Sequence, residues 1–119
     1  MSSTRGVMAQ ANAIIVRIRK EEAAEFERLF EAEELPLWEE LSSEGKFLQA
    51  RLARVEYGSE ERDDVALYLI YAEVPSMTEH SHHDRDRRFN AFLEKAQRLQ
   101  PEPPSVFGGN IVFERRAST

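Results

Sequence analysis

The sequence of 119 residues contains no cysteine, which excludes several kinds of chemistry at once. Without a thiol the chain has no disulfide bond, no thiolate nucleophile and no cysteine-ligated metal. It also lacks an apolar run of about 18 residues, the length that a membrane-spanning helix needs. Residues 1–11 contain no apolar core of the kind found in secretion signals. We therefore expect a cytoplasmic protein with no membrane partner.

Basic residues are in the minority, because 16 Lys and Arg stand against 22 Asp and Glu and give a net charge of −6. Nucleic acids and anionic membrane surfaces are bound by clustered cations that replace counterions. The basic clusters of this chain are short, and Arg85, Arg87 and Arg88 alternate with aspartates. We expect no nucleic-acid partner.

The most apolar stretch is 65–74, VALYLIYAEV, which carries one charge in ten residues. In a strand its side chains alternate between two faces, and here both faces are apolar. Such a strand must be covered on both sides. In a chain this short, helices cover one face, and a second copy of the protein is the expected cover for the other. The stretch therefore predicts a homodimer.

Changes of hydrophobic period predict the remaining elements. We expect the first helix to end near Leu35, because a residue before proline avoids helical geometry, and a shorter helix to start at Pro36. The hydrophobic alternation of 47–57 shifts phase near Leu52 and Ala53, which indicates either a bulge or a strand that is apolar on both faces at its middle. A second bulge is expected at the glycines 108–109. The predicted strands are 12–19, 47–57, 65–74 and 106–113, and the predicted helices are 20–34, 36–43 and 78–100.

This order of strand, helix, strand, strand, helix, strand is that of the split β-α-β, ferredoxin-like fold. It predicts an α+β domain with an antiparallel sheet, one face of which is covered by helices. The length allows only one such domain. We assign it to residues 12–116, after a flexible N-terminal arm of residues 1–11.

All three histidines lie within the segment HSHHD, as His80, His82 and His83, just before Asp84. A carboxylate near an imidazole can hold one tautomer and tune a general base near neutral pH. The three histidines are therefore candidate catalytic residues. The alternatives are exposed residues at a helix start or incidental metal binding. No zinc site is expected, because Arg85 stands where the H-x-H-x-D zinc motif of metallo-β-lactamases continues with a histidine.

Two strand arginines, Arg17 and Arg51, have neighbours that indicate burial. A buried guanidinium needs a partner, which is either an anionic ligand or a protein acid such as Glu73 or Glu114. Both arginines are therefore candidate ligand-binding residues. The alternative is a structural ion pair within the dimer or at a sheet edge.

Three aromatic side chains are further candidates for ligand binding. Tyr68 and Tyr71 offer phenol groups from the apolar strand, and Trp38 offers a ring that covers an aromatic substrate. The alternative for all three is ordinary core packing.

The order of elements and the segment YLIYAEVPSMTEHSHHDRDRRFNAFLE resemble the dimeric α+β barrel superfamily. In this segment an aromatic strand precedes a helix with histidines in its first turns and then the pair Phe89 and Phe92. The superfamily includes antibiotic-biosynthesis-type monooxygenases, EthD-like proteins and muconolactone-isomerase-like enzymes, and the subfamily stays unassigned. The resemblance implies a ligand cavity between sheet and helices and no shared cofactor. Some members degrade haem with an Asn, a Trp and a helix His, a trio that is not matched here.

Two functions follow as hypotheses. The first is a cofactor-independent oxygenase or isomerase that acts on a small apolar or aromatic compound, with a histidine as base and an Arg or Tyr that stabilises an oxyanion. The second is a non-catalytic dimeric module that binds a ligand or only assembles. A haem-handling protein is a third, weaker alternative.

Overall fold

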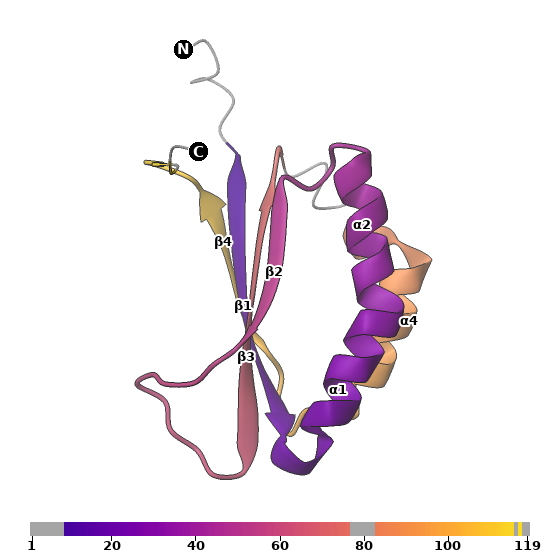
Figure 1. Ribbon diagram of the computed structural model, residues 1–119, viewed down its shortest axis with the longest axis vertical. Coiled ribbons are helices and arrows are strands. Elements are labelled where there is room, and N and C mark those ends of the chain that lie inside the picture. Colours follow the sequence, from indigo (N-terminus) through magenta and orange to yellow (C-terminus); the bar gives the residue numbers. More distant parts are fainter. Residues whose placement is uncertain (1–8, 77–82, 116, 118–119) are drawn as a thin grey trace.

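The computed structural model describes residues 9–76, 83–115 and 117. Four strands form one antiparallel sheet with the order β2-β3-β1-β4. Helices pack against one face of this sheet, and the other face carries no described helix (Figure 1). The ferredoxin-like α+β fold predicted from the sequence is confirmed. The strands are β1 (Gln10–Arg19), β2 (Gln49–Arg54), β3 (Val65–Val74) and β4 (Ser105–Asn110).

The first helical region is one continuous rod instead of two separate helices, so the predicted end near Leu35 is wrong. The backbone N–H of Leu35 donates to the carbonyl oxygen of Phe30, five residues earlier, in a π-helical turn. This wider turn lets the chain stay helical into Pro36, which has no N–H to donate. The rod consists of η2 (Lys20–Glu22), α1 (Ala23–Leu29), η3 (Phe30–Glu34) and α2 (Leu35–Ser43).

The predicted helix over 78–100 is interrupted, because residues 83–85 are helical, Asp86 is not, and the last helix, α4, runs over Arg87–Gln97. Asp86 has extended backbone geometry and its carboxylate accepts the N–H of Arg88, so it caps the helix and separates it from residues 83–85. Residues 77–82, where the predicted helix begins, lie outside the described residues.

Both predicted bulges are absent, since pairing runs unbroken through Leu52 and Ala53 and through Gly108 and Gly109. The change of hydrophobic phase near residue 53 marks the approaching end of β2, and Tyr57 belongs to the loop, where it is 92% exposed. The glycines fit the regular ladder.

The core lies between the helices and the inner face of the sheet. Tyr68 on β3 is 1% exposed and packs on Phe26 of α1 with ring centroids 4.8 Å apart. Phe30 contacts both Trp38 and Phe92 edge-on. These aromatic contacts join both helical regions to the sheet.

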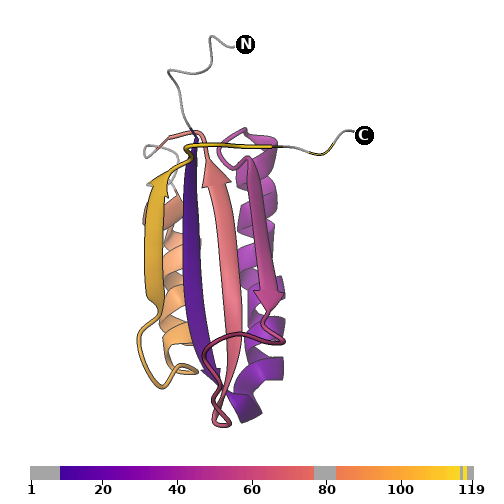
Figure 2. The same cartoon turned by 90° about the vertical axis from the view of Figure 1, so that its left-hand side faces the viewer.

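The outer face of the sheet is apolar as well, as the sequence of β3 predicts. Leu69 in the middle of β3 is 37% exposed, and Phe107 on β4 is 63% exposed. Figure 2 shows this face toward the viewer, with the chain after β4 crossing one end of it. None of the described helices is long and apolar enough to cross a membrane.

Candidate functional site

A buried polar cluster lies on the inner side of the fold, where the helical rod meets the residues before α4. The Nε2 atom of His83 lies 2.5 Å from Oε2 of Glu34, and the indole N–H of Trp38 donates to the same oxygen at 2.8 Å. Glu34 is only 2% exposed and His83 only 8%. The cluster therefore holds a carboxylate and an imidazole in a largely apolar interior.

The π-helical turn positions Glu34 in this cluster. Glu34 and Phe30 are the buried residues of η3, whereas Glu31 in the same turn is exposed. Glu34 and Trp38 are four residues apart, so their side chains lie on one face of the helix. The surrounding aromatic rings hold the imidazole, with Phe89 at 4.2 Å and Phe47 at 5.4 Å between ring centroids.

Both nitrogens of His83 face carboxylates, because Nδ1 lies 3.2 Å from Oδ1 of Asp84 while Nε2 faces Glu34. Burial lowers the pKa of His83, but the hydrogen bonds and negative charges of Glu34 and Asp84 outweigh it and leave the pKa above its usual value. An imidazolium with both N–H groups donating fits this geometry. In that state the ring has no free lone pair.

Three buried side-chain polar atoms have no hydrogen-bond partner among the described residues. They are Oε1 of Glu34, Nδ2 of Asn12 on β1 and Oε1 of Gln100 after α4, and the first two lie in the interior next to the sheet. Buried side-chain polar atoms usually have a partner, so each such atom calls for an explanation. Periodicity did not single out Glu34 or Asn12, because an acid on a Glu-rich helix and a strand amide carry no distinctive pattern.

A cleft of about 450 Å³ opens between the edge strand β2 and the helical rod. Its apolar lining includes Phe30, Leu35 and Trp38, and Arg51 and Arg54 lie on its β2 side. Trp38 belongs to both the cleft and the buried cluster, since its ring lines the cleft and its N–H donates to Glu34 in the cluster. The cleft thus has the size of a small-molecule site and an open, mixed lining, in which these apolar side chains stand beside the charged residues Glu27, Glu31, Arg51 and Arg54.

Tyr68 supplies the phenol group of this cleft. Its hydroxyl donates to Oε2 of Glu27 at 2.5 Å, and Nη1 of Arg54 lies 3.7 Å from the same oxygen. Burial, with the hydrogen bond to Glu27, raises the pKa of Tyr68 well above its usual value of 10.0. Tyr68 therefore remains a protonated donor at neutral pH.

The structure divides the residues that the sequence singled out. Trp38, Arg51 and Tyr68 line one cleft, and Trp38 connects it to His83 through Glu34. The predicted burial of Arg51 is wrong, because this residue lies on the edge strand β2 and is exposed. Arg17 and Tyr71 point to the outer face of the sheet instead. The candidates His80 and His82 lie outside the described residues. The acids Glu27 and Glu34 were not predicted to belong to the site.

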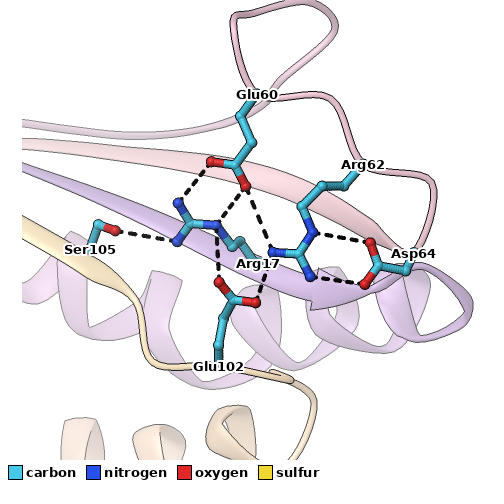
Figure 3. A network of polar contacts seen from close by, with 6 residues as sticks. All are labelled: Arg17, Glu60, Arg62, Asp64, Glu102 and Ser105. Atoms are coloured by element: carbon cyan, nitrogen blue, oxygen red, sulfur yellow. Dashed lines mark hydrogen bonds and ion pairs between the residues drawn. The ribbon is translucent and has the colours of Figure 1, made fainter.

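Arg17 has a protein partner, as one of the two interpretations predicted, but the partner is Glu60 and neither Glu73 nor Glu114. Its guanidinium binds Glu60 through Nε at 2.8 Å and Nη2 at 2.9 Å (Figure 3). The proposed partner Glu73 instead accepts the hydroxyl of Tyr71 at 2.8 Å. This network ties the loop before β3 and the segment before β4 to β1, and it also contains Arg62, Asp64, Glu102 and Ser105.

No metal centre emerges from the described part of the chain, which contains no group of three or more His, Asp or Glu side chains placed to hold an ion. The zinc-like sequence fragment cannot be followed further, since two of its histidines lie outside that part.

Comparison with known proteins identifies the fold. No protein-family model matches the sequence, and no curated protein matches it. A candidate antibiotic biosynthesis monooxygenase from Caulobacter crescentus superposes with a TM-score of 0.72 over 89% of this chain and 92% of that chain, at 20% identity. A dimeric ferredoxin-like protein from an uncultured marine organism superposes with a TM-score of 0.74 over 93% and 94% of the two chains, at 16% identity.

A further structure, named as an antibiotic biosynthesis monooxygenase, has a TM-score of 0.66 and covers 88% of this chain and 99% of its own, at 17% identity. At these identities the likeness concerns the fold. It agrees with the resemblance seen in the sequence and leaves the subfamily unassigned. The chain has the ferredoxin-like fold of antibiotic biosynthesis monooxygenase-like proteins.

Proposed function

We propose that the protein is a homodimeric enzyme of the monooxygenase type, which acts without a cofactor on a small apolar or aromatic compound. The observation that carries this proposal is the buried cluster of His83, Glu34 and Trp38 next to a partly apolar cleft. Ionisable groups in a dry interior cost free energy, and they concentrate at sites where proton transfer is needed. The monooxygenase names of several neighbours support the same reaction class.

In this proposal the substrate ring lies in the cleft against Trp38 and Phe30. Arg51 and Arg54 supply positive charge near an oxygen of the substrate. The pair of His83 and Glu34 takes a proton from the substrate and leaves an anion. In an oxygenase this anion gives electrons to molecular oxygen, whereas in an isomerase it takes the proton back at another atom.

The enzymatic proposal is tested with a panel of phenols, hydroquinones and enolisable ketones. Oxygen uptake and product masses are measured for the wild type and for a variant with His80, His82 and His83 replaced by Ala. We expect the triple variant to lose turnover by about 10²-fold or more, the usual contribution of a general acid–base group. Arg85→Ala, an exposed neighbour, is the control. Unchanged substrate affinity and turnover in the triple variant would contradict the proposal.

The dimer is proposed from the apolar outer face of the sheet, of which Leu69 and Phe107 are exposed members. A second copy covers such a face with the same surface of its own sheet. The dimeric ferredoxin-like neighbour supports this arrangement. We expect sedimentation to find a dimer for the wild type and a monomer for Leu69→Arg. Leu48→Arg, at a 52% exposed position next to β2, is the control.

The alternative is a non-catalytic dimeric module that binds a ligand or only assembles. It is favoured because His83 contacts both Glu34 and Asp84, and a buried ion pair that only stabilises the fold would have the same contacts. A compound that raises the melting temperature but is not converted by the wild type supports this alternative. Haem titration tests the third possibility, since a protein that stays colourless is not a haem-binding one.

A further inference from the structure

We propose that Glu34 is the proton acceptor of this site, and that its substrates are compounds with an acidic O–H or C–H, such as phenols and enolisable ketones. This inference rests on the proposed function and names the group that carries out its first step. His83 then acts as the positioning residue and counterion of Glu34, and Trp38 as a second positioning residue.

The first step of the argument concerns His83. Its two nitrogens lie 2.5 Å from Glu34 and 3.2 Å from Asp84, so both positions are taken by carboxylate acceptors. A ring that donates at both nitrogens has no lone pair for a substrate proton. His83 is therefore placed as a donor, and the accepting group of the pair lies elsewhere.

Glu34 provides that group. Its Oε2 accepts from both Trp38 and His83, which fixes the carboxylate in one orientation. Its Oε1 is buried and has no hydrogen-bond partner among the described residues. An ionised carboxylate oxygen only accepts hydrogen bonds, so a ligand that brings an acidic proton satisfies it. A purely structural pair gains nothing from this unsatisfied oxygen, whose desolvation costs free energy.

The local backbone supports the same role. Glu34 lies in a π-helical turn, and such turns inside helices occur frequently at functional sites. Trp38 contacts Glu34 through its N–H and the cleft through its ring, so one side chain joins the ligand space to the carboxylate. Glu34 itself is buried and does not line the cleft, so the proposal requires the acidic group of the substrate to reach its carboxylate beside the indole of Trp38.

The proposed proton transfer keeps the buried charges paired. The O–H or C–H bond of the substrate breaks, an O–H bond forms at Oε1 of Glu34, and the electron pair stays on the substrate as a phenolate or enolate. Glu34 becomes neutral, and the imidazolium of His83 becomes the counterion of the substrate anion. No unpaired charge is left in the interior, where an uncompensated charge is strongly destabilising.

The first test uses the wild-type protein and needs no substrate. Nitrogen NMR of labelled protein at pH 7 is expected to show both nitrogens of His83 protonated. A neutral ring with one bare nitrogen would overturn the inference, because His83 would then be available as the base. Among the described residues, the other ionisable groups near this pair are Asp84, which faces Nδ1, and Asp86, which interacts electrostatically with His83.

The second test measures turnover of the same phenols and ketones. Glu34→Gln is expected to lower kcat by about 10³-fold with a KM within a few-fold of wild type, as for loss of a general base. Glu34→Asp is expected to keep part of the rate, because it keeps a carboxylate, and Trp38→Phe is expected to lose less than Glu34→Gln. Glu39→Gln, an exposed acid of α2, is the control. Circular dichroism verifies that each variant is folded.

The outcomes separate the two proposals. An active wild type with an equally active Glu34→Gln overturns the role of Glu34 and leaves the proposed function standing. A wild type that converts no member of the panel overturns the proposed function and this inference together.

Discussion

Replacing His83 by Phe tests whether the buried ion pair is the interaction that holds the helical rod to the segment before α4. The two partners are 49 residues apart in the sequence and 2.5 Å apart in space. Phe fills most of the volume of the imidazole among Phe47 and Phe89, so the change leaves little cavity. What it removes is the positive charge beside Glu34.

The expected loss follows from the burial of both partners, since the side chain of Glu34 is 3% exposed and that of His83 is 11% exposed. Removing one partner of a buried ion pair costs about 3–5 kcal/mol, because the remaining charge is left uncompensated. Trp38 still donates to Glu34, so we expect about 3 kcal/mol, near the lower end. For a domain of this size that corresponds to a Tm lower by roughly 10 °C.

Urea unfolding at one protein concentration measures this loss, since dimerisation would make midpoints depend on concentration. A double variant, His83→Phe with Glu34→Met, removes both charges. It is expected to be at least about 1 kcal/mol more stable than His83→Phe alone, because the unpaired carboxylate is gone. A His83→Phe loss below about 1 kcal/mol, or a double variant whose losses simply add, would refute the claim that the two groups form a buried charged pair.

Two further predictions concern pH and backbone packing. Pairing with Glu34 raises the pKa of His83 above its usual value. The stabilisation by this pair is therefore fully present below about pH 6.5 and is lost as the pH rises through the higher pKa of the folded state. We expect the free energies of unfolding of wild type and His83→Phe, measured by urea titration, to converge at alkaline pH. Gly108→Ala places a Cβ atom 2.8 Å from Oδ1 of the buried Asn12, whereas at Gly109 nothing lies within 4 Å. We expect the first change to cost about 1–3 kcal/mol and the second far less, and equal thermal melts of the two variants would contradict the described packing.

Much of the fold could be predicted from local pattern. The period-two alternation of β1 and the doubly apolar stretch of β3 correctly predicted both central strands, because apolar side chains at alternating positions are typical of strands in the middle of a sheet. The errors lie at Leu35 and near residue 53. At Leu35 a π-helical turn overrode the usual effect of a following proline, and after residue 53 the apolar residues belong to a loop.

The candidate site was predicted only in part. Trp38, Arg51 and Tyr68 do meet in one cleft, but Arg17 and Tyr71 lie on the other face of the sheet. Strand alternation separates Arg17 and Tyr71 from Tyr68 once the register is known, as Arg17 pairs with Leu67 and Tyr71 with Ala13 on the outer face. Arg51 stands opposite Tyr71 and contributes to the cleft from the edge strand β2. The acid that binds Arg17 comes from the loop before β3, and a loop residue has no periodicity that would reveal its partner.

By itself the sequence determined the order of strands and helices, the apolar nature of both sheet faces and the clustering of the histidines, because these properties depend on neighbouring residues. Only the tertiary structure decided that Glu34, one of many acids on the first helical region, is buried beside His83 with one oxygen that has no hydrogen-bond partner in the described part of the chain. The physical reason is that burial and pairing arise between residues distant in the chain. A local sequence pattern shows which side chains are present, whereas tertiary packing determines which of them are buried away from solvent.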